Sequence, residues 1–517
     1  MIESMPDLLL YNARVLTMDP KLPMGELVAV KGNRIHTVGC NRDVSSLQGQ
    51  RTRLIDCKGM FVIPGFNDAH CHPISLALNR VYIDCSPQKT HCIADIVEQI
   101  GQRCTEAPNG TWIRAAGYSE LQLEEKKHPN RWDLDRAAPD NPVILIHETG
   151  KTCVLNSLSL KLAGITRDTR PSGTGHIGKD LNSGEPDGII FGLIDDLKTR
   201  IPPVEKEELL DGIKLVDEQY RSHGITAVHD TSWTNRLHHW KYYMELKGAH
   251  KLSPRVTMMV GSDWVEEFQQ HGLSTRHGTE RLTLGAVKIA LDESKGLEHP
   301  SEQELHAHAL RAHRAGFQLA FHVHDIQSLH TSISTIRFLA QSETGHPKRP
   351  RLEHCPVCPP EVIPKIKSHE AIVVTQPYFI HHTGDQFLRD VSTDALSWLF
   401  PLRTLMDRGV TTAISSDSPL LPFEPLKGIH AAVCRKTKSG REIAPGEALS
   451  VLDALQMYTI SPAYASFEEG SRGTISPGKL ADIAVLSDDP GLLKKEDMMR
   501  IEVVLTIIDG KVVWDQF

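Results

Sequence analysis

Short apolar runs alternate with longer, mostly polar stretches through the middle of the chain. Such runs, rich in Val, Ile, Leu and Ala, are typical of strands buried on both faces, and most of the stretches between them are compatible with helices. We therefore predict an α/β fold with eight parallel strands and right-handed crossovers, as in a (β/α)8 TIM barrel. The predicted strands lie at residues 61–70, 224–230, 254–260, 285–291, 317–323, 350–354, 371–377 and 410–417.

The two ends of the chain have a different pattern from the middle. Residues 7–62 and the C-terminal segment both alternate short β-prone runs with Gly and Asn, and Asp509-Gly510 is typical of a hairpin turn. We predict that residues 1–62 and 468–517 together form one composite β-sandwich domain, while residues 63–467 form the barrel. The first two strands are too far apart for one crossover, which predicts an α+β insertion at about 75–210.

Composition and charge argue against a nucleic-acid-binding, membrane-spanning or disulfide-rich protein. The 517 residues include 57 Lys and Arg against 65 Asp and Glu, so the formal net charge of -8 argues against a nucleic-acid groove. We find neither an apolar stretch long enough to span a bilayer nor a secretory leader, and expect a cytoplasmic protein without membrane contact. Ten cysteines over this length do not indicate a disulfide framework.

Polar side chains collect at the carboxyl ends of the predicted strands, which is the face where barrels of this kind carry their active sites. Lys288, His322 and His354 follow one another at steps of 34 and 32 residues, about one β/α unit, and Asp417 comes 63 residues later. Imidazole and carboxylate groups in such a set suit a borderline cation such as zinc. The predicted metal ligands are His70, His72, Lys288, His322, His354 and Asp417.

Each of these residues also has an ordinary structural reading. The chain contains 27 histidines, so His70 and His72 could be surface residues near a turn, and His322 or His354 a satisfied, half-buried imidazole. Asp417 could cap a helix, and Lys288 could pair with a carboxylate. The repeated placement at strand ends favours the metal site.

Nine motifs make the sequence similar to a known family. The chain resembles the amidohydrolase superfamily, and within it the YtcJ-like (amidohydrolase 3) family, almost from end to end. The motifs are VIPGFNDAHCHP (62–73), APDNPVILIHETGKTCVLNSLSLKLAGI (138–165), GEPDGII (184–190), GAVKIALDES (285–294), FHVHD (321–325), RLEHC (351–355), AISSDSP (413–419), ISPAYASF (460–467) and GTISPGKLADIAVL (473–486).

The resemblance implies roles for the candidate ligands. It implies that His70 and His72 hold the more buried ion with Asp417, and that His322 and His354 hold a second ion. Lys288 resembles a lysine that is carboxylated in binuclear members, where the carbamate bridges both metals; burial in an apolar strand would favour its deprotonation. Asp417 would be both a ligand and the catalytic proton shuttle. The expected cofactor is one or two divalent ions, with zinc favoured.

Departures from the family pattern point to substrate contacts. Lys151 stands where relatives have a histidine ahead of Asn156-Ser157, which hints at an anionic or carbonyl-rich substrate group, although a solvated surface lysine is an equal alternative. The FHVHD segment is one residue shorter than usual, which leaves His324 as a further site residue. The predicted substrate-binding residues are Tyr118, Lys151, Asn156 and His324, with His229 as a neighbour of the metal ligands.

The preferred function is a metal-dependent hydrolase that cleaves an amide or N-acyl C–N bond of a small molecule. A deaminase of a ring amidine, using one metal and no carbamate, is the nearest alternative. A non-enzymatic scaffold on the same fold is a third, although such a protein should lack some of the ligands. Family habit indicates a homodimer.

Overall fold

The computed structural model describes residues 5–170, 175–192, 197, 200–290, 301–342 and 345–517. These residues divide into two compact units, one formed by the described residues within 1–72, 217–290 and 301–517 and the other by those within 73–216. Residues 291–294, at the end of the motif GAVKIALDES, lie outside the described residues.

The first unit contains a nearly closed parallel sheet of eight strands, which confirms the predicted (β/α)8 barrel. Each barrel strand pairs with the barrel strands that precede and follow it in the sequence, as expected for successive β/α units. They are β22 (Thr412–Ile414), β21 (Ile372–Thr375), β20 (Arg351–His354), β19 (Leu319–Val323), β18 (Leu282–Ile289), β16 (Arg255–Gly261), β15 (Ile225–Asp230) and β8 (Phe66–Cys71). Each overlaps a strand predicted from the sequence.

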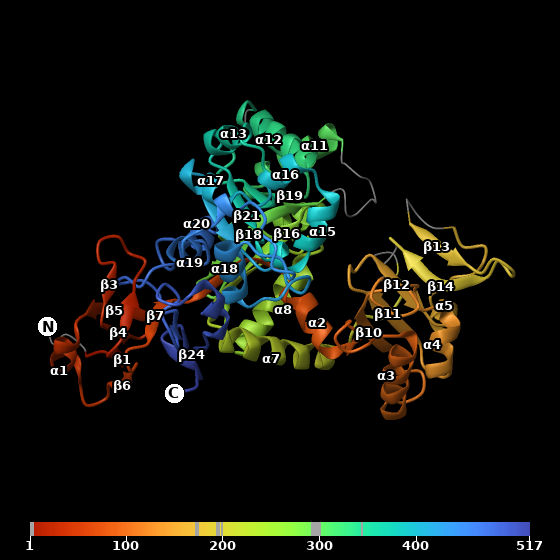
Figure 1. The fold of residues 1–517 in the computed structure, drawn as a ribbon, viewed down its shortest axis with the longest axis horizontal. Coiled ribbons are helices and arrows are strands. Elements are labelled where there is room, and N and C mark those ends of the chain that lie inside the picture. Colours follow the sequence, from red (N-terminus) through yellow and green to blue (C-terminus); the bar gives the residue numbers. More distant parts are fainter. Residues whose placement is uncertain (1–4, 171–174, 193–196, 198–199, 291–300, 343–344) are drawn as a thin grey trace. The chain divides into compact units, whose positions relative to one another are not determined.

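Helices connect the barrel strands and cover the outside of the sheet. In Figure 1, α11, α12 and α13 lie beside strands of the barrel. Capping side chains fix several helix starts: Ser301 caps α11 and Asp325 caps α12, each accepting from a backbone N–H of the first turn. The connecting helices include α8 (Leu237–Gly248), α9 (Val265–Gln270), α11 (Glu302–Arg314), α12 (Ile326–Ala340), α13 (Ile363–Ser368) and α17 (Leu402–Asp407). The last barrel strand is followed by α18 (Pro425–Cys434), α19 (Val451–Met457) and α20 (Ile460–Ala465).

The same unit contains two sheets built from the ends of the chain. Strand β23 (Ile483–Leu486) pairs with β7 (Phe61–Pro64), so the C-terminal segment completes a sheet begun by the N-terminal one. A shared apolar core lies between the two sheets. One has the order β5 (Arg34–Gly39), β4 (Leu27–Lys31), β1 (Leu8–Tyr11), β6 (Arg53–Asp56), and the other β25 (Lys511–Asp515), β24 (Val503–Ile508), β23, β7, β2 (Arg14–Leu16), β3 (Met24–Gly25).

The predicted hairpin at the C-terminus is confirmed. Strands β24 and β25 are antiparallel and are joined by Asp509 and Gly510, with φ angles of 57° and 73°. A two-residue turn with both φ angles positive matches the twist of the flanking strands, and glycine adopts this conformation without steric cost.

The second unit is an α+β fold around a mixed six-stranded sheet. Helices α3 (Ile93–Glu106) and α4 (Arg131–Ala137) pack on each other, and their apolar side chains share a core with β10 and β11. Two further helices are α2 (Pro73–Val81) and α5 (Ser157–Leu162). The strand order is β13 (His176–Lys179), β14 (Pro186–Phe191), β12 (Thr152–Leu155), β11 (Val143–His147), β10 (Ile113–Tyr118) and β9 (Ile83–Asp84).

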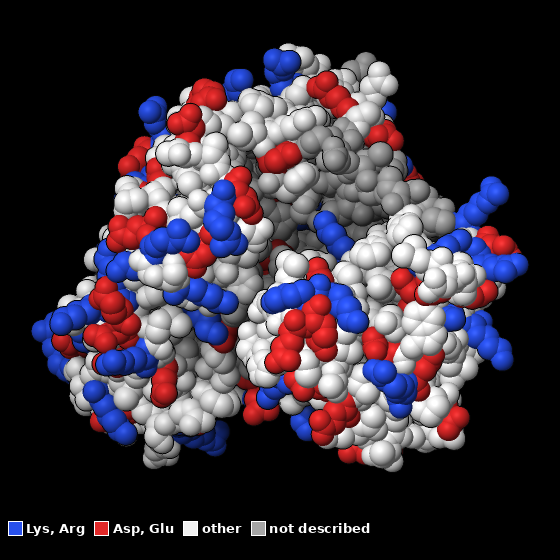
Figure 2. Space-filling model, turned by 45° about the vertical axis from the view of Figure 1, so that its right-hand side comes forward, with Lys and Arg blue, Asp and Glu red and all other residues white. Residues whose placement is uncertain are grey.

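The surface carries both charge signs. On the face drawn in Figure 2, Lys and Arg are interspersed with Asp and Glu. Within the described part of the chain, no helix combines the length and the apolar character that crossing a membrane requires.

A buried ion pair links the barrel to the C-terminal sheet. Arg255, at the start of β16, donates from Nε and Nη2 to the two carboxylate oxygens of Asp482, at 2.6 and 3.0 Å. Both side chains are at most 5% exposed. Nη2 also lies 3.0 Å from Asp509. Since neither charge reaches solvent, each depends on the other for stabilisation.

We predict that Asp482→Asn lowers the free energy of unfolding by about 3–5 kcal/mol, because it leaves the buried guanidinium beside Asp482 without its main counter-charge. Urea denaturation followed by fluorescence measures the change. Asp488→Asn, at an exposed position, is the matched control and should shift the midpoint little. Equal midpoints for the two variants would contradict a structural role for this pair.

Candidate metal centre

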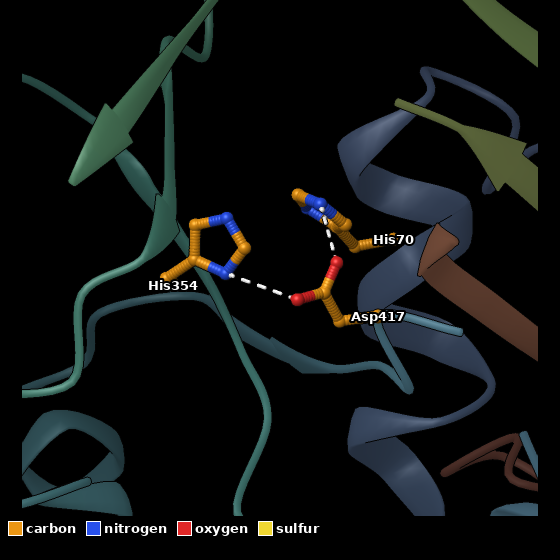
Figure 3. Close-up of side chains that lie close together, drawn as sticks. All are labelled: His70, His354 and Asp417. Carbon is orange, nitrogen blue, oxygen red and sulfur yellow. Dashed lines mark ion pairs between the residues drawn. The ribbon is translucent and has the colours of Figure 1, made fainter. Parts of the chain in front are cut away.

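Three candidate ligands lie together at the carboxyl end of the barrel strands. His70 Nε2 lies 3.3 Å from Asp417 Oδ1, and His354 Nδ1 lies 3.9 Å from Asp417 Oδ2 (Figure 3). One ligand atom from each residue falls within 4.8 Å of the others, close enough to share an ion. His70 is 1% exposed and the Asp417 side chain 8%, so an ion at this position would be largely shielded from water.

His72 joins this group from the same strand end. Residues 70 and 72 point to one side because side chains alternate along an extended segment. Their ring centroids are 5.5 Å apart, and His72 Nε2 lies 3.2 Å from Asp417 Oδ1. Asp417 therefore faces both histidines with the same oxygen.

The first and last barrel strands meet at these ligands. The backbone N–H of Asp417 donates to the carbonyl of His70 at 2.8 Å, and that of His72 donates to Ser418, also at 2.8 Å. Asp417 and His354 have φ angles of 59° and 71°, a left-handed conformation that is uncommon for residues with a side chain. Such conformations concentrate at functional sites, where the surroundings hold them.

Asp68 stabilises the seam, the junction at which the first and last barrel strands meet. Its carboxylate accepts from the backbone N–H groups of His70 and Ser416 at 3.2 and 3.0 Å, and from the Ser416 hydroxyl at 2.5 Å. Burial raises the pKa of Asp68 to about 6, although these hydrogen bonds favour the ionised form. The position of Asp417 relative to His70 thus depends on a carboxylate two residues before the first ligand.

A polar partner holds Nδ1 of each histidine in the centre. His70 Nδ1 lies 2.5 Å from Glu353 Oε2, and His354 Nδ1 lies 3.0 Å from Gln376 Oε1. His72 Nδ1 lies 2.9 Å from the hydroxyl oxygen of Ser232.

These partners accept rather than donate. Glu353 offers carboxylate oxygens, and Gln376 faces His354 with its amide oxygen because its Nε2 donates to Ser415. Ser232 uses its proton on Asp230 Oδ1, 2.6 Å away. With Nδ1 of each ring engaged by an acceptor, Nε2 is the nitrogen that can bind a cation once it carries no proton.

The charge states suit a cation. Burial opposes ionisation of Asp417, but its hydrogen bonds with His70 and His72 hold its pKa well below the usual range, so Asp417 is a carboxylate. Burial moves the pKa of His354 well below its ordinary value, so this ring is neutral. For His72, burial is outweighed by Asp417, which raises the pKa; a divalent cation would take the place of the proton that Asp417 favours.

Lys288 and His322 belong to the same cluster. The ring centroids of His322 and His354 are 4.6 Å apart. Lys288, on β18 and only 3% exposed, is close enough for its charge to lower the pKa values of both Glu353 and His354. The structure thus groups His70, His354 and Asp417 around one position, with His72 and His322 beside them and Lys288 near enough to act on them through its charge.

The predicted substrate-binding residues have other surroundings. His324 lies on the same unit as the metal ligands, with its side chain 40% exposed. Tyr118 is fully buried in the second unit and its hydroxyl lies 2.9 Å from His128 Nδ1. Lys151 is exposed on the loop between β11 and β12.

Asn156 has a structural role that the sequence reading missed. Its Oδ1 accepts from the backbone of Val143 and Ser159 at 3.0 and 2.9 Å, and its Nδ2 donates to Ala138 and Asn141 at 3.1 and 2.9 Å. The side chain is fully buried and caps α5. All of its hydrogen-bonding capacity is used, so no group remains for a substrate.

Sequence reasoning also missed the partners of the ligands. Arg351 and Glu353 are two residues apart on β20, so both face one side of the strand, where they form an ion pair. The alternation Arg-Leu-Glu within a buried strand was the signal available for them. Gln376 and Ser232 follow strands at the same end of the barrel and carried no comparable signal.

Comparison with known proteins finds a matching family and similar relatives. The chain matches the amidohydrolase family over residues 53–514. It is 28% identical to an N-substituted formamide deformylase of Arthrobacter pascens, covering 98% of both chains, and 27% identical to the putative amidohydrolase YtcJ of Bacillus subtilis, covering 98% of this chain and 99% of the relative.

A solved structure extends the comparison to the fold. An uncharacterised metal-dependent hydrolase of Pyrococcus horikoshii matches with a TM-score of 0.78 and 22% identity, over 95% of this chain and 99% of that one.

We predict that Ser416→Ala lowers the free energy of unfolding by about 1.5–3 kcal/mol, because it removes a buried hydrogen bond to the Asp68 carboxylate. Chemical denaturation measures the loss. Ser397→Ala, which removes an exposed hydroxyl bonded to a backbone carbonyl, is the control and should cost far less. A Ser416 variant as stable as this control would show that Asp68 does not stabilise the junction of the first and last barrel strands.

Proposed function

As a member of the amidohydrolase family, the chain is a hydrolase of carbon–nitrogen bonds other than peptide bonds, and we propose that it cleaves an amide or N-acyl group of a small molecule with the help of a divalent ion. His70, His354 and Asp417 would hold this ion. The observation that carries the proposal is their convergence, with one ligand atom from each within 4.8 Å.

The donor set fits a divalent cation. Two imidazoles, which bind a cation in their neutral form, and a carboxylate give one negative charge, and each ring has Nδ1 engaged by a polar partner. Zinc accepts nitrogen and oxygen donors of this kind, so zinc is the ion we propose. His72, His322 and Lys288 stand beside the set and could hold a second ion, with Lys288 contributing as a carbamate.

A divalent ion in such a site supplies two effects: it lowers the pKa of water and polarises the substrate carbonyl. The protein supplies the rest. The Asp417 carboxylate accepts a proton from the attacking water and returns it to the leaving nitrogen, so that an amine departs rather than an amide anion. Burial of the surrounding side chains keeps these charges in a poorly screened environment, where each acts more strongly.

The substrate class follows from the chemistry of a relative. The formamide deformylase of Arthrobacter pascens is coextensive with this chain and 28% identical to it. Its name describes removal of a formyl group from a substituted nitrogen, which is hydrolysis of a small amide. We therefore propose N-acyl, including N-formyl, amines as the substrates to test first.

We predict that activity on an N-alkylformamide, measured as formate release, is lost on dialysis against a chelator and restored by zinc. Asp417→Asn should lower kcat by about 10²–10⁴-fold, because an amide cannot carry the proton to the leaving nitrogen. Asp390→Asn, at an exposed position, is the control and should leave kcat unchanged. Full activity after chelation, in protein shown to be free of metal, would contradict the proposal.

We predict that Lys288→Ala reduces the metal content from two ions to one per chain, and that millimolar acetate restores the second ion by supplying the missing carboxylate. Metal analysis and the intact mass of the wild-type protein, with or without one carbon dioxide, measure this. Thermal unfolding checks that the variant is folded. If Lys288→Ala retains the wild-type metal content and activity, the carbamate is excluded and a one-metal deaminase becomes the better reading.

A further inference from the structure

A buried ion pair lies directly behind the ligand His70. Glu353 is fully buried, Arg351 is 1% exposed, and the guanidinium Nε donates to Glu353 Oε1 at 2.6 Å. The other carboxylate oxygen, Oε2, accepts from His70 Nδ1 at 2.5 Å. The three side chains thus form one line of contacts, from a permanent cation through a carboxylate to an imidazole.

Arg351 is itself tied to the barrel wall on two sides. Its Nη2 donates to the backbone carbonyl of Ala69 at 2.7 Å, next to His70 in the chain. Its Nη1 lies 3.0 Å from Nδ1 of His229, a fully buried residue of the second barrel strand. Burial, together with the charge of Arg351, keeps the pKa of His229 well below its ordinary value, so His229 accepts this hydrogen bond. The pair therefore bridges strands β8, β15 and β20.

Glu353 accepts hydrogen bonds with both of its oxygens in this setting. Oε1 accepts from Arg351 Nε, and Oε2 accepts from His70 Nδ1 and, at 3.2 Å, from Arg351 Nη2. As a carboxylate it can only accept, which fixes the proton of His70 on Nδ1 and leaves Nε2 facing Asp417 Oδ1, 3.3 Å away.

We propose that Glu353, held in place by Arg351, is a positioning residue that fixes the tautomer and orientation of His70 and thereby sets the affinity of the site for its metal ion. This inference rests on the proposed function only in assuming that an ion binds at His70. A carboxylate behind a ligating imidazole also increases the basicity of the ligand. A glutamine could not replace it, because the amide NH2 that takes the place of one oxygen would face a donor, either Arg351 Nε at Oε1 or His70 Nδ1 at Oε2.

We predict that Glu353→Gln weakens zinc binding by about 10–100-fold, the usual cost of losing the partner behind a ligating histidine. Zinc affinity is measured on the full-length apoprotein by competition with a chromophoric chelator, so the readout does not depend on turnover. The visible spectrum of the cobalt-loaded protein should also change, because His70 is reoriented. Glu361→Gln, on an exposed loop, is the matched control and should bind zinc as the wild type does.

A double variant separates positioning from simple charge balance. Arg351→Met combined with Glu353→Leu removes both charges, and apolar replacement of a buried pair often preserves the fold. We expect wild-type thermal stability with zinc binding still weakened by about 10–100-fold. Zinc affinity within threefold of wild type in this folded double variant, or in Glu353→Gln, would overturn the inference. If the wild-type protein itself bound no zinc, the proposed function would fail instead.

Discussion

The candidate centre depends on the seam where the last barrel strand returns to the first. Two backbone hydrogen bonds, from Asp417 to His70 and from His72 to Ser418, close the mouth of the barrel at the ligands themselves. Asp68 reinforces them by accepting from both sides of the seam. Because ligand positions must be held to a fraction of an ångström, placing them on the closing hydrogen bonds gives the site the stiffness of the sheet.

Behind the seam, buried polar groups determine which atoms face the centre. Glu353, Gln376 and Ser232 each engage one imidazole through Nδ1. Burying these groups is costly unless they are fully hydrogen-bonded, and Arg351 meets that requirement for Glu353. These buried polar groups hold the orientation of the rings, since apolar side chains in their place would offer Nδ1 no acceptor.

The sequence predicted the barrel and the residues of the centre because both depend on local patterns. Short apolar runs mark strands buried on both faces, and His322, His354 and Asp417 recur at the spacing of β/α units. The environment of Asn156 was not predictable in this way, since its four hydrogen bonds reach backbone groups up to 18 residues away. Whether an asparagine stabilises the fold or binds a ligand depends on its tertiary contacts, and the spacing of residues along the sequence does not show these.

The ligand set can be tested most directly by zinc-edge X-ray absorption on the zinc-loaded, full-length protein. Coordination by His70, His354 and Asp417 predicts a first shell of nitrogen and oxygen at about 2.0–2.2 Å, with the outer-shell scattering of imidazole rings. Cys355 and Cys358 are buried thiols close in sequence to His354 and offer the main competing donors. Sulfur scattering at about 2.3 Å, or the absence of imidazole scattering, would contradict a centre built on the barrel seam.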